Sequence, residues 1–192
     1  MNNIVIMGLP AAGKGTLCQR LSQQYGFEHI STGEILRSEQ AKGTKLGNMA
    51  TRVIDSGGYM PDDIMIPMLK ERVIASDNAV GFLFDGFPRT KEQAKHLHAF
   101  LFMRKQPIAS VIFLDVKKNV AVERLLKRAT IENRPDDTES AIVNRWNEYE
   151  QKTLPLIDYF SKLGLIETVD ANGTTDHSHA QASVIIDRIL KP

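Results

Sequence analysis

The chain has 192 residues, of which 42% are hydrophobic, and its 24 basic and 23 acidic side chains leave a formal net charge of +1. This length fits one domain with small inserts, and the balanced charge argues against a broad nucleic-acid or membrane surface. The single cysteine, Cys18, excludes an internal disulfide. With neither a signal peptide nor a membrane span apparent, we expect a soluble, cytoplasmic protein.

A phosphate-binding loop is predicted near the start of the chain. The apolar residues 3–7 read as a strand, GLPAAGKGT (8–16) follows, and a helical pattern begins near Lys14. In this context the backbone N–H groups and the positive helix end face an anion, and the lysine ammonium reaches the outer phosphates. Gly15 stands where the general pattern has Ser or Thr, and Thr16 follows it. A glycine-rich turn without a ligand is the alternative, but the flanking strand and helix favour a nucleoside triphosphate site.

The rest of the chain alternates apolar runs with helical patterns. Further strands are expected over 27–30, 82–84, 109–114 and 165–169. Helices are expected up to Gly26, from the capping-box pattern at 31–34 with breaks to Ser76, over 90–105, up to Arg128, over 138–162 with a kink at Pro155, and up to Leu190. Strands that are apolar throughout indicate an α/β fold: a five-stranded parallel sheet with helices on both faces.

In such sheets ligands bind beyond the carboxyl ends of the strands. The phosphate loop, Thr32, Asp85, Asp115 and Gly173 all follow predicted strand ends. Asp85 has the position at which phosphate-loop enzymes hold Mg²⁺, directly or through water, although a helix-capping role is the alternative.

Several arginines could bind phosphate. Arg124 and Arg128 stand four apart on one predicted helix, where an anion would relieve their repulsion, but a solvated face with Glu123 is equally compatible with the spacing. Arg134 could pair with the neighbouring aspartates 136 and 137, and Arg145 with a nearby glutamate.

Arg37 and Arg89 are harder to assign to the surface. Both follow strand ends and should therefore lie near the phosphate loop. The arginines as a group point to a highly anionic ligand more strongly than any one of them does.

The motifs GLPAAGKGT (8–16), STGEILR (31–37), DGFPRTKEQ (85–93), RLLKR (124–128), RPDD (134–137) and NRWNEYEQKTLPLIDYF (144–160) together resemble adenylate kinases, in order and across essentially the whole chain. The resemblance implies a phosphate-loop core over 1–30, 61–128 and 136–192. It also implies a helical AMP-binding insert over 31–60 and a short lid over 129–135.

The resemblance also implies the roles of individual residues. For ATP these are Pro10, Ala11, Ala12, Gly13, Lys14, Gly15, Thr16, Arg124, Arg128 and Gly173. For AMP they are Thr32, Arg37, Gly58, Tyr59, Met60, Gly86, Phe87, Pro88, Arg89, Gln93, Arg134 and Arg145, of which Arg89, Arg134 and Arg145, with Lys14, would act on the transferred phosphoryl group.

Two departures from the family pattern stand out. Ala11 occupies a position that is usually glycine, so its backbone angles must tolerate a Cβ. Gly58, Tyr59 and Met60 replace the common Leu-Val pair, which loosens the assignment of the base pocket.

The implied reaction is reversible, Mg²⁺-dependent phosphoryl transfer from ATP to AMP in a monomer. The phosphate oxygen of AMP is already anionic at neutral pH, so alignment and charge neutralisation should suffice without a general base. A pyrimidine (UMP/CMP) monophosphate kinase is the nearest alternative; Thr32 and Gln93 favour AMP, and we expect Gln93 to contact the adenine edge. A nucleotide-binding regulatory module is the alternative from another class, but it would not need the arginines.

Overall fold

The computed structural model describes residues 2–76, 80–131 and 138–191. In these residues five strands form one parallel sheet, as expected, and their order across the sheet is β2-β3-β1-β4-β5. The strands are β1 (Asn3–Gly8), β2 (Glu28–Ser31), β3 (Phe82–Asp85), β4 (Ile108–Asp115) and β5 (Ile166–Asp170). The helical elements are α1 (Lys14–Tyr25), α2 (Thr32–Ala41), α3 (Lys45–Ser56), α4 (Asp62–Ala75), α5 (Lys91–Met103), α6 (Lys118–Ile131), α7 (Glu139–Glu148), η1 (Tyr149–Thr153), α8 (Pro155–Lys162) and α9 (Thr175–Leu190).

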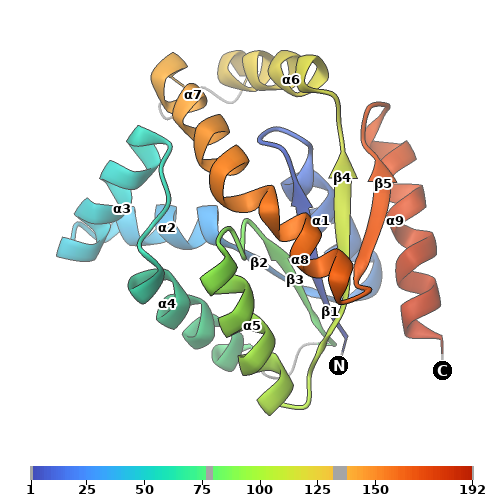
Figure 1. The fold of residues 1–192 in the computed structure, drawn as a ribbon. Coiled ribbons are helices and arrows are strands. Elements are labelled where there is room, and N and C mark those ends of the chain that lie inside the picture. The colour runs from blue at the N-terminus through green and yellow to red at the C-terminus, as the bar shows by residue number, and fades with distance from the viewer. Residues whose placement is uncertain (1, 77–79, 132–137, 192) are drawn as a thin grey trace.

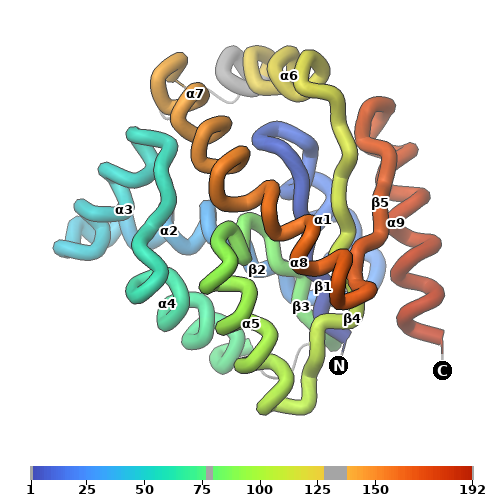
Figure 2. Tube along the Cα trace, viewed as in Figure 1, coloured from blue at the N-terminus to red at the C-terminus, as the bar shows by residue number. Residues whose placement is uncertain are grey.

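Helices cover both faces of the sheet because successive side chains of a buried strand point to opposite sides. Val5 and Met7 of β1 belong to a core with α4, α5 and α8, whereas Ile4 and Ile6 pack in a second core with α1 and α9. In Figure 1, α2 and α3 lie at one side of the molecule and α9 at the other. Both chain ends lie near the edge of the sheet opposite α6 and α7 (Figure 2).

Parallel pairing places every carboxyl strand end at one edge of the sheet. β1 lies at the centre, where Ile6 pairs with Asp85 of β3 and Gly8 with Leu114 of β4. The segments that follow the strands therefore meet at this edge, toward which β4 points in Figure 1.

Local sequence signals set several helix ends. Gly26 ends α1 in the left-handed conformation, with a φ of 76°. The Ser31 hydroxyl caps α2 by accepting the N–H of Glu34 at 3.4 Å. The capping motif and the glycine stop predicted from the sequence are thus confirmed.

The expected single long helix over 138–162 is wrong in one respect. The chain forms α7, then the π-helical turn η1, and then α8, with the N–H of Leu154 donating to the carbonyl of Tyr149 at 2.8 Å. Pro155 has no N–H and its ring crowds the carbonyl four residues earlier, so the preceding turn widens.

No helix in the described part of the chain combines the length and the apolar character needed to cross a bilayer.

Candidate nucleotide site

A cavity of about 980 Å³ opens at the carboxyl edge of the sheet. This volume is near the upper end of the usual range for ligand pockets. Segments far apart in the sequence line it, and the predicted site residues among them are Pro10, Ala11, Ala12, Gly13, Lys14, Gly15, Thr16, Arg37, Gly58, Tyr59, Asp85, Gly86, Pro88, Arg89, Arg124, Arg145 and Gly173.

The phosphate loop forms a tight turn between β1 and α1. The N–H of Ala12 donates to the carbonyl of Leu9 at 3.0 Å. Gly13, with a φ of 97°, directly precedes α1, and Ala11 takes a φ of 62° although it carries a Cβ. The loop therefore holds one alanine in a left-handed conformation that usually requires glycine.

Lys14 lies at the first position of α1 and its side chain folds back over the loop. Its ammonium group donates to the carbonyls of Gly8 and Leu9 at 2.9 and 2.8 Å. These contacts hold the cation at the helix N-terminus, where positive charge and backbone N–H groups favour an anion.

Arg124 of α6 joins the phosphate loop to the turn after β5. Its guanidinium donates to the carbonyl of Ala12 at 3.4 Å and to that of Gly173 at 2.8 Å. The arginine and glycine that sequence analysis assigned to the same ligand therefore touch each other across 49 residues of sequence.

A second cluster forms where β2 and β3 end. Thr32 donates through its hydroxyl to the carbonyl of Gly86 at 3.0 Å, and the Nε of Arg89 donates to the same carbonyl at 2.7 Å. A Cβ on Gly86 would lie 2.5 Å from Oγ1 of Thr32 and 2.8 Å from Nη2 of Arg89. Only glycine lets these two side chains converge on one carbonyl.

Tyr59 holds the other side of Arg89, which sequence analysis did not anticipate. The guanidinium carbon lies 4.8 Å from the centre of the Tyr59 ring. Thr153 donates its only hydroxyl proton to the carbonyl of Arg89 at 3.0 Å, so Tyr59 must donate in the 2.8 Å contact between the two hydroxyls. The π-helical turn η1 thus supplies a support for Arg89.

Arg145 of α7 reaches the C-terminal end of α3. It donates to the carbonyl of Ile54 at 3.4 Å, and the neighbouring Asn144 donates to the carbonyl of Ser56 at 2.8 Å. Gly57 allows the helices to meet so closely, because a Cβ there would lie 2.2 Å from the carbonyl oxygen of Ala141. The positive side chain of Arg145 lines the cavity from this position.

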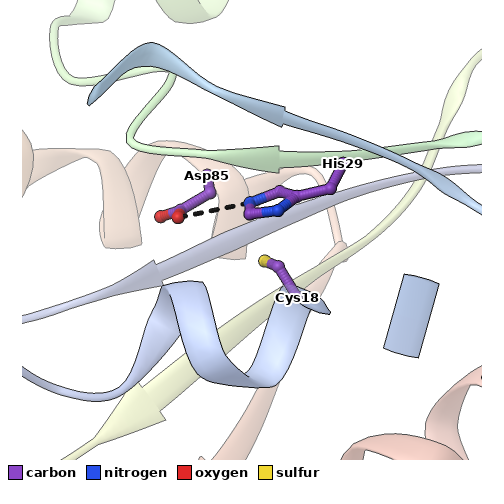
Figure 3. Close-up of side chains that lie close together, drawn as sticks. All are labelled: Cys18, His29 and Asp85. Atoms are coloured by element: carbon purple, nitrogen blue, oxygen red, sulfur yellow. Dashed lines mark hydrogen bonds and ion pairs between the residues drawn. The ribbon is translucent and has the colours of Figure 1, made fainter. Parts of the chain in front are cut away.

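Asp85 ends β3 next to the phosphate loop, and a Cβ on Gly15 would lie 3.5 Å from its carboxylate. Burial alone would raise the pKa of Asp85, but the hydrogen bond with His29 and the positive charges of Lys14 and Arg89 together lower it. His29 Nε2 lies 3.4 Å from Oδ2 of Asp85 (Figure 3). An ionised carboxylate at this position offers hard oxygen ligands of the kind that Mg²⁺ takes.

The cavity lining does not include Thr32, Met60, Phe87 or Gln93, which are all buried. The carboxamide of Gln93 donates to Asp62 at 2.6 Å and accepts the N–H of Arg89 at 2.8 Å. In this structure the side chain therefore positions the Arg89 backbone from behind. Arg134 and most of the expected lid (132–135), and the side chain of Arg128, lie outside what the structure describes.

Tyr149 of η1 is a lining residue that sequence analysis missed. It is buried, and its hydroxyl has no hydrogen-bond partner among the described residues. Burial, followed by the nearby Tyr59 and Asp115, raises the pKa of Tyr149 to about 12, so the phenol stays protonated at neutral pH. The register of the π-helical turn directs Tyr149 toward the cavity, and the sequence pattern did not reveal that register.

A parallel sheet with helices on both faces, a phosphate loop and arginines that converge on one cavity define a phosphate-loop nucleotide kinase. A sequence model of the family described as "Adenylate kinase" matches residues 6–165. Adenylate kinases of Leptospira biflexa and Maricaulis maris are 41% and 40% identical to the chain over 176 and 185 residues. These alignments cover 92% and 96% of this chain and 95% and 98% of the relatives. The chain belongs to the adenylate kinase family. The pyrimidine kinase alternative finds no support among these relatives.

Proposed function

We propose that the cavity brings ATP and AMP together and transfers the terminal phosphoryl group of ATP to AMP, reversibly, giving two molecules of ADP. The observation that carries this proposal is the convergence on a single cavity of Lys14 from α1, Asp85 and Arg89 from the end of β3 and the turn after it, and Arg145 from α7. Two polyanions can approach end to end only where several cations offset their repulsion.

On the donor side, ATP binds to the phosphate loop. The backbone of Pro10 to Thr16 and the ammonium of Lys14 hold its phosphates, and Arg124, with Arg128, acts near the triphosphate and adenine. The contact between Arg124 and the carbonyl of Gly173 supports an adenine position at the turn after β5.

On the acceptor side, AMP binds between the C-terminal end of α3 and the turn after β3. Arg37 and Arg89 neutralise its phosphate, with Thr32 and the segment 86–88 shaping the site, and Gly58, Tyr59 and Met60 contribute from the exit of α3. Gln93 remains our candidate for the adenine edge. A base contact requires its present pair with Asp62 to open.

The phosphoryl group moves by alignment and charge neutralisation. We assign Lys14, Arg89, Arg134 and Arg145 to the transferred phosphoryl group, and no side chain has to remove a proton from AMP. The ionised carboxylate of Asp85 would hold Mg²⁺, directly or through water. When bound with ATP, this ion neutralises charge on the triphosphate. We expect the helical insert over 31–60 to be one cover of the cavity and the short lid over 129–135 to be the other, so that their closure excludes water.

The first test measures ADP formed from Mg-ATP with AMP, GMP, CMP, UMP or no acceptor. We expect rapid ADP formation with AMP and little without it. ATP turnover that is independent of any monophosphate would contradict the proposal and favour a regulatory nucleotide-binding module. Comparable rates with CMP would instead restore the pyrimidine alternative.

The loop lysine gives a sharper test. Lys14→Ala should fold normally but lose at least ~2 kcal/mol of transition-state stabilisation, or roughly thirtyfold in kcat/KM. Lys127→Ala is a matched control, because that lysine pairs on the surface with Glu123. Normal turnover in Lys14→Ala would contradict the assigned role.

The cytoplasmic location, the monomeric state and the restriction of partners to small nucleotides stay predictions. Sedimentation of the purified chain at several concentrations tests the second of these.

A further inference from the structure

Three potential metal ligands lie together behind the phosphate loop. Cys18 comes from α1, His29 from β2 and Asp85 from the end of β3. One ligand atom from each lies within 4.8 Å of the other two. Figure 3 shows the three side chains lying close together. Cys18 is fully buried, and the side chains of His29 and Asp85 are only 16% and 13% exposed.

The donor set differs from the one that Mg²⁺ uses. A sulfur, an imidazole nitrogen and a carboxylate oxygen are ligands of Zn²⁺ and Co²⁺, whereas Mg²⁺ takes oxygen ligands and water. Three protein ligands leave the fourth tetrahedral position for water. The cluster thus has the number and the kinds of ligand of an open zinc site.

The spacing also fits a small ion after modest side-chain rotation. Bonds of about 2.0–2.3 Å place two ligands of a tetrahedral ion roughly 3.3–3.8 Å apart. The observed separations of up to 4.8 Å therefore require a contraction of at most roughly 1.5 Å. The contact of 3.4 Å between His29 and Asp85 already lies in this range.

An ion has a route to the cluster. His29 and Asp85 both line the nucleotide cavity, whereas Cys18 lies behind them. An ion entering from the cavity would meet the imidazole and the carboxylate first. It would then displace the thiol proton of Cys18 to solvent as the sulfur binds, with neutral His29 donating a lone pair.

We propose that Cys18, His29 and Asp85 form a binding site for a thiol-seeking divalent cation of the Zn²⁺ class, and that its occupation inhibits phosphoryl transfer. Inhibition follows because the ion engages the same carboxylate that we assign to Mg²⁺ support. This second part rests on the proposed kinase function; the binding site itself does not.

The binding site is tested by titrating the purified, metal-free protein with Co²⁺ and recording its absorption spectrum. Because Cys18 is the only cysteine, a sulfur-to-cobalt charge-transfer band in the near ultraviolet reports on this site alone. We expect one equivalent to bind with that band and with visible bands of tetrahedral cobalt. Cys18→Ser and Cys18→Ala should lose the ultraviolet band and bind Zn²⁺ at least about tenfold more weakly in chelator competition.

Two variants control the experiment. His29→Gln should also weaken the cobalt spectrum, whereas His96→Ala, which alters an exposed histidine beside Glu92, should leave it unchanged. Circular dichroism confirms that each variant is folded. A wild-type protein that shows no charge-transfer band at millimolar Co²⁺, or a band that survives in Cys18→Ala, would overturn the proposal.

Kinase assays at saturating Mg²⁺ test the inhibition. We expect micromolar Zn²⁺ to inhibit the wild type, a chelator to restore activity, and Cys18→Ala to need at least about tenfold more Zn²⁺. Equal sensitivity of the two proteins would refute inhibition through this site. If the chain made no ADP at all, the kinase proposal would fail while the cobalt titration still decided the binding site.

Discussion

Ala11 shows how a single residue can carry strain within a binding loop. Among the described residues only Ala11 and Lys105 combine a side chain with a positive φ. The left-handed conformation costs an L-residue about 1–2 kcal/mol, and glycine avoids that cost. Glycine in turn lowers the stability of the folded protein by about 0.5–1 kcal/mol relative to alanine, because the unfolded chain is more flexible at a glycine.

We therefore expect Ala11→Gly to raise the free energy of unfolding by about 0.5–1 kcal/mol. Urea denaturation measures the change. Ala12→Gly is the matched control: Ala12 is buried and has no positive φ, so the substitution should destabilise the protein. Equal effects at the two positions would show that Ala11 is not strained.

Tyr59 gives a second prediction at this scale. Tyr59→Phe keeps the ring beside Arg89 but loses the hydroxyl contact with Thr153, whereas Tyr59→Leu loses both. We expect the KM for AMP to rise about fivefold in the first variant, from one lost hydrogen bond. A further two- to fivefold rise is expected in the second, from the lost ring contact.

The KM for ATP should change little in either Tyr59 variant, because the phosphate loop is untouched. Steady-state kinetics with each substrate varied in turn check this. Parallel changes in both KM values would point to a general loss of structure instead of a role in positioning Arg89.

Sequence reasoning worked for residues whose role depends on near neighbours. The phosphate-loop glycines, the Ser31 cap and the stop at Gly26 are governed by local backbone requirements, and the structure confirms these local features. Sequence reasoning could not reveal that Tyr59 packs on Arg89 or that Gln93 binds Asp62, since those contacts join segments about 30 residues apart.

At the scale of elements, the contact between α3 and α7 depends on Gly57. This residue has a φ of 69°, and a Cβ there would overlap the carbonyl of Ala141 at 2.2 Å. Backbone atoms form this obstacle, so no side-chain rotation can relieve it.

We expect Gly57→Ala to destabilise the protein by at least about 2 kcal/mol, from the strained φ and the overlap together. It should also raise the KM for AMP, because α7 carries Arg145. Gly43→Ala isolates the backbone cost, since Gly43 has a φ of 65° with open space around it. Denaturation curves that match for the two variants would contradict the packing explanation.

The sequence predicted the alternation of strands and helices well but missed the π-helical turn. Apolar runs and glycine stops define strands and helix ends locally, whereas the choice between α and π turns before Pro155 depends on one extra residue per turn. Hydrophobic spacing cannot resolve so small a change of register.

At the scale of the whole molecule, cations gather in the cavity although the net charge is only +1. Long-range attraction of nucleotides should therefore be weak, and electrostatic attraction should act mostly at short range within the site. Salt shortens the range of such forces from about 10 Å at 0.1 M to about 3 Å at 1 M.

Raising KCl from 0.05 to 0.5 M should thus increase the KM for AMP by roughly two- to fivefold and change kcat less, because the closed site shields the transferring group. Initial rates at each salt concentration, with potassium glutamate replacing chloride as a control, measure this. A KM independent of salt would mean that the arginines do not act on the phosphate of AMP.

The order of the strands has a consequence for synthesis of the protein. β1 is made first, yet it pairs with β3 and β4, whose last residues are Asp85 and Asp115. The emerging polypeptide must therefore leave the ribosome for more than half its length before the strand that carries the phosphate loop is flanked on both sides. Gly173, the partner of Arg124, emerges later still. We therefore expect a chain that ends before Gly173 to lack part of the nucleotide cavity.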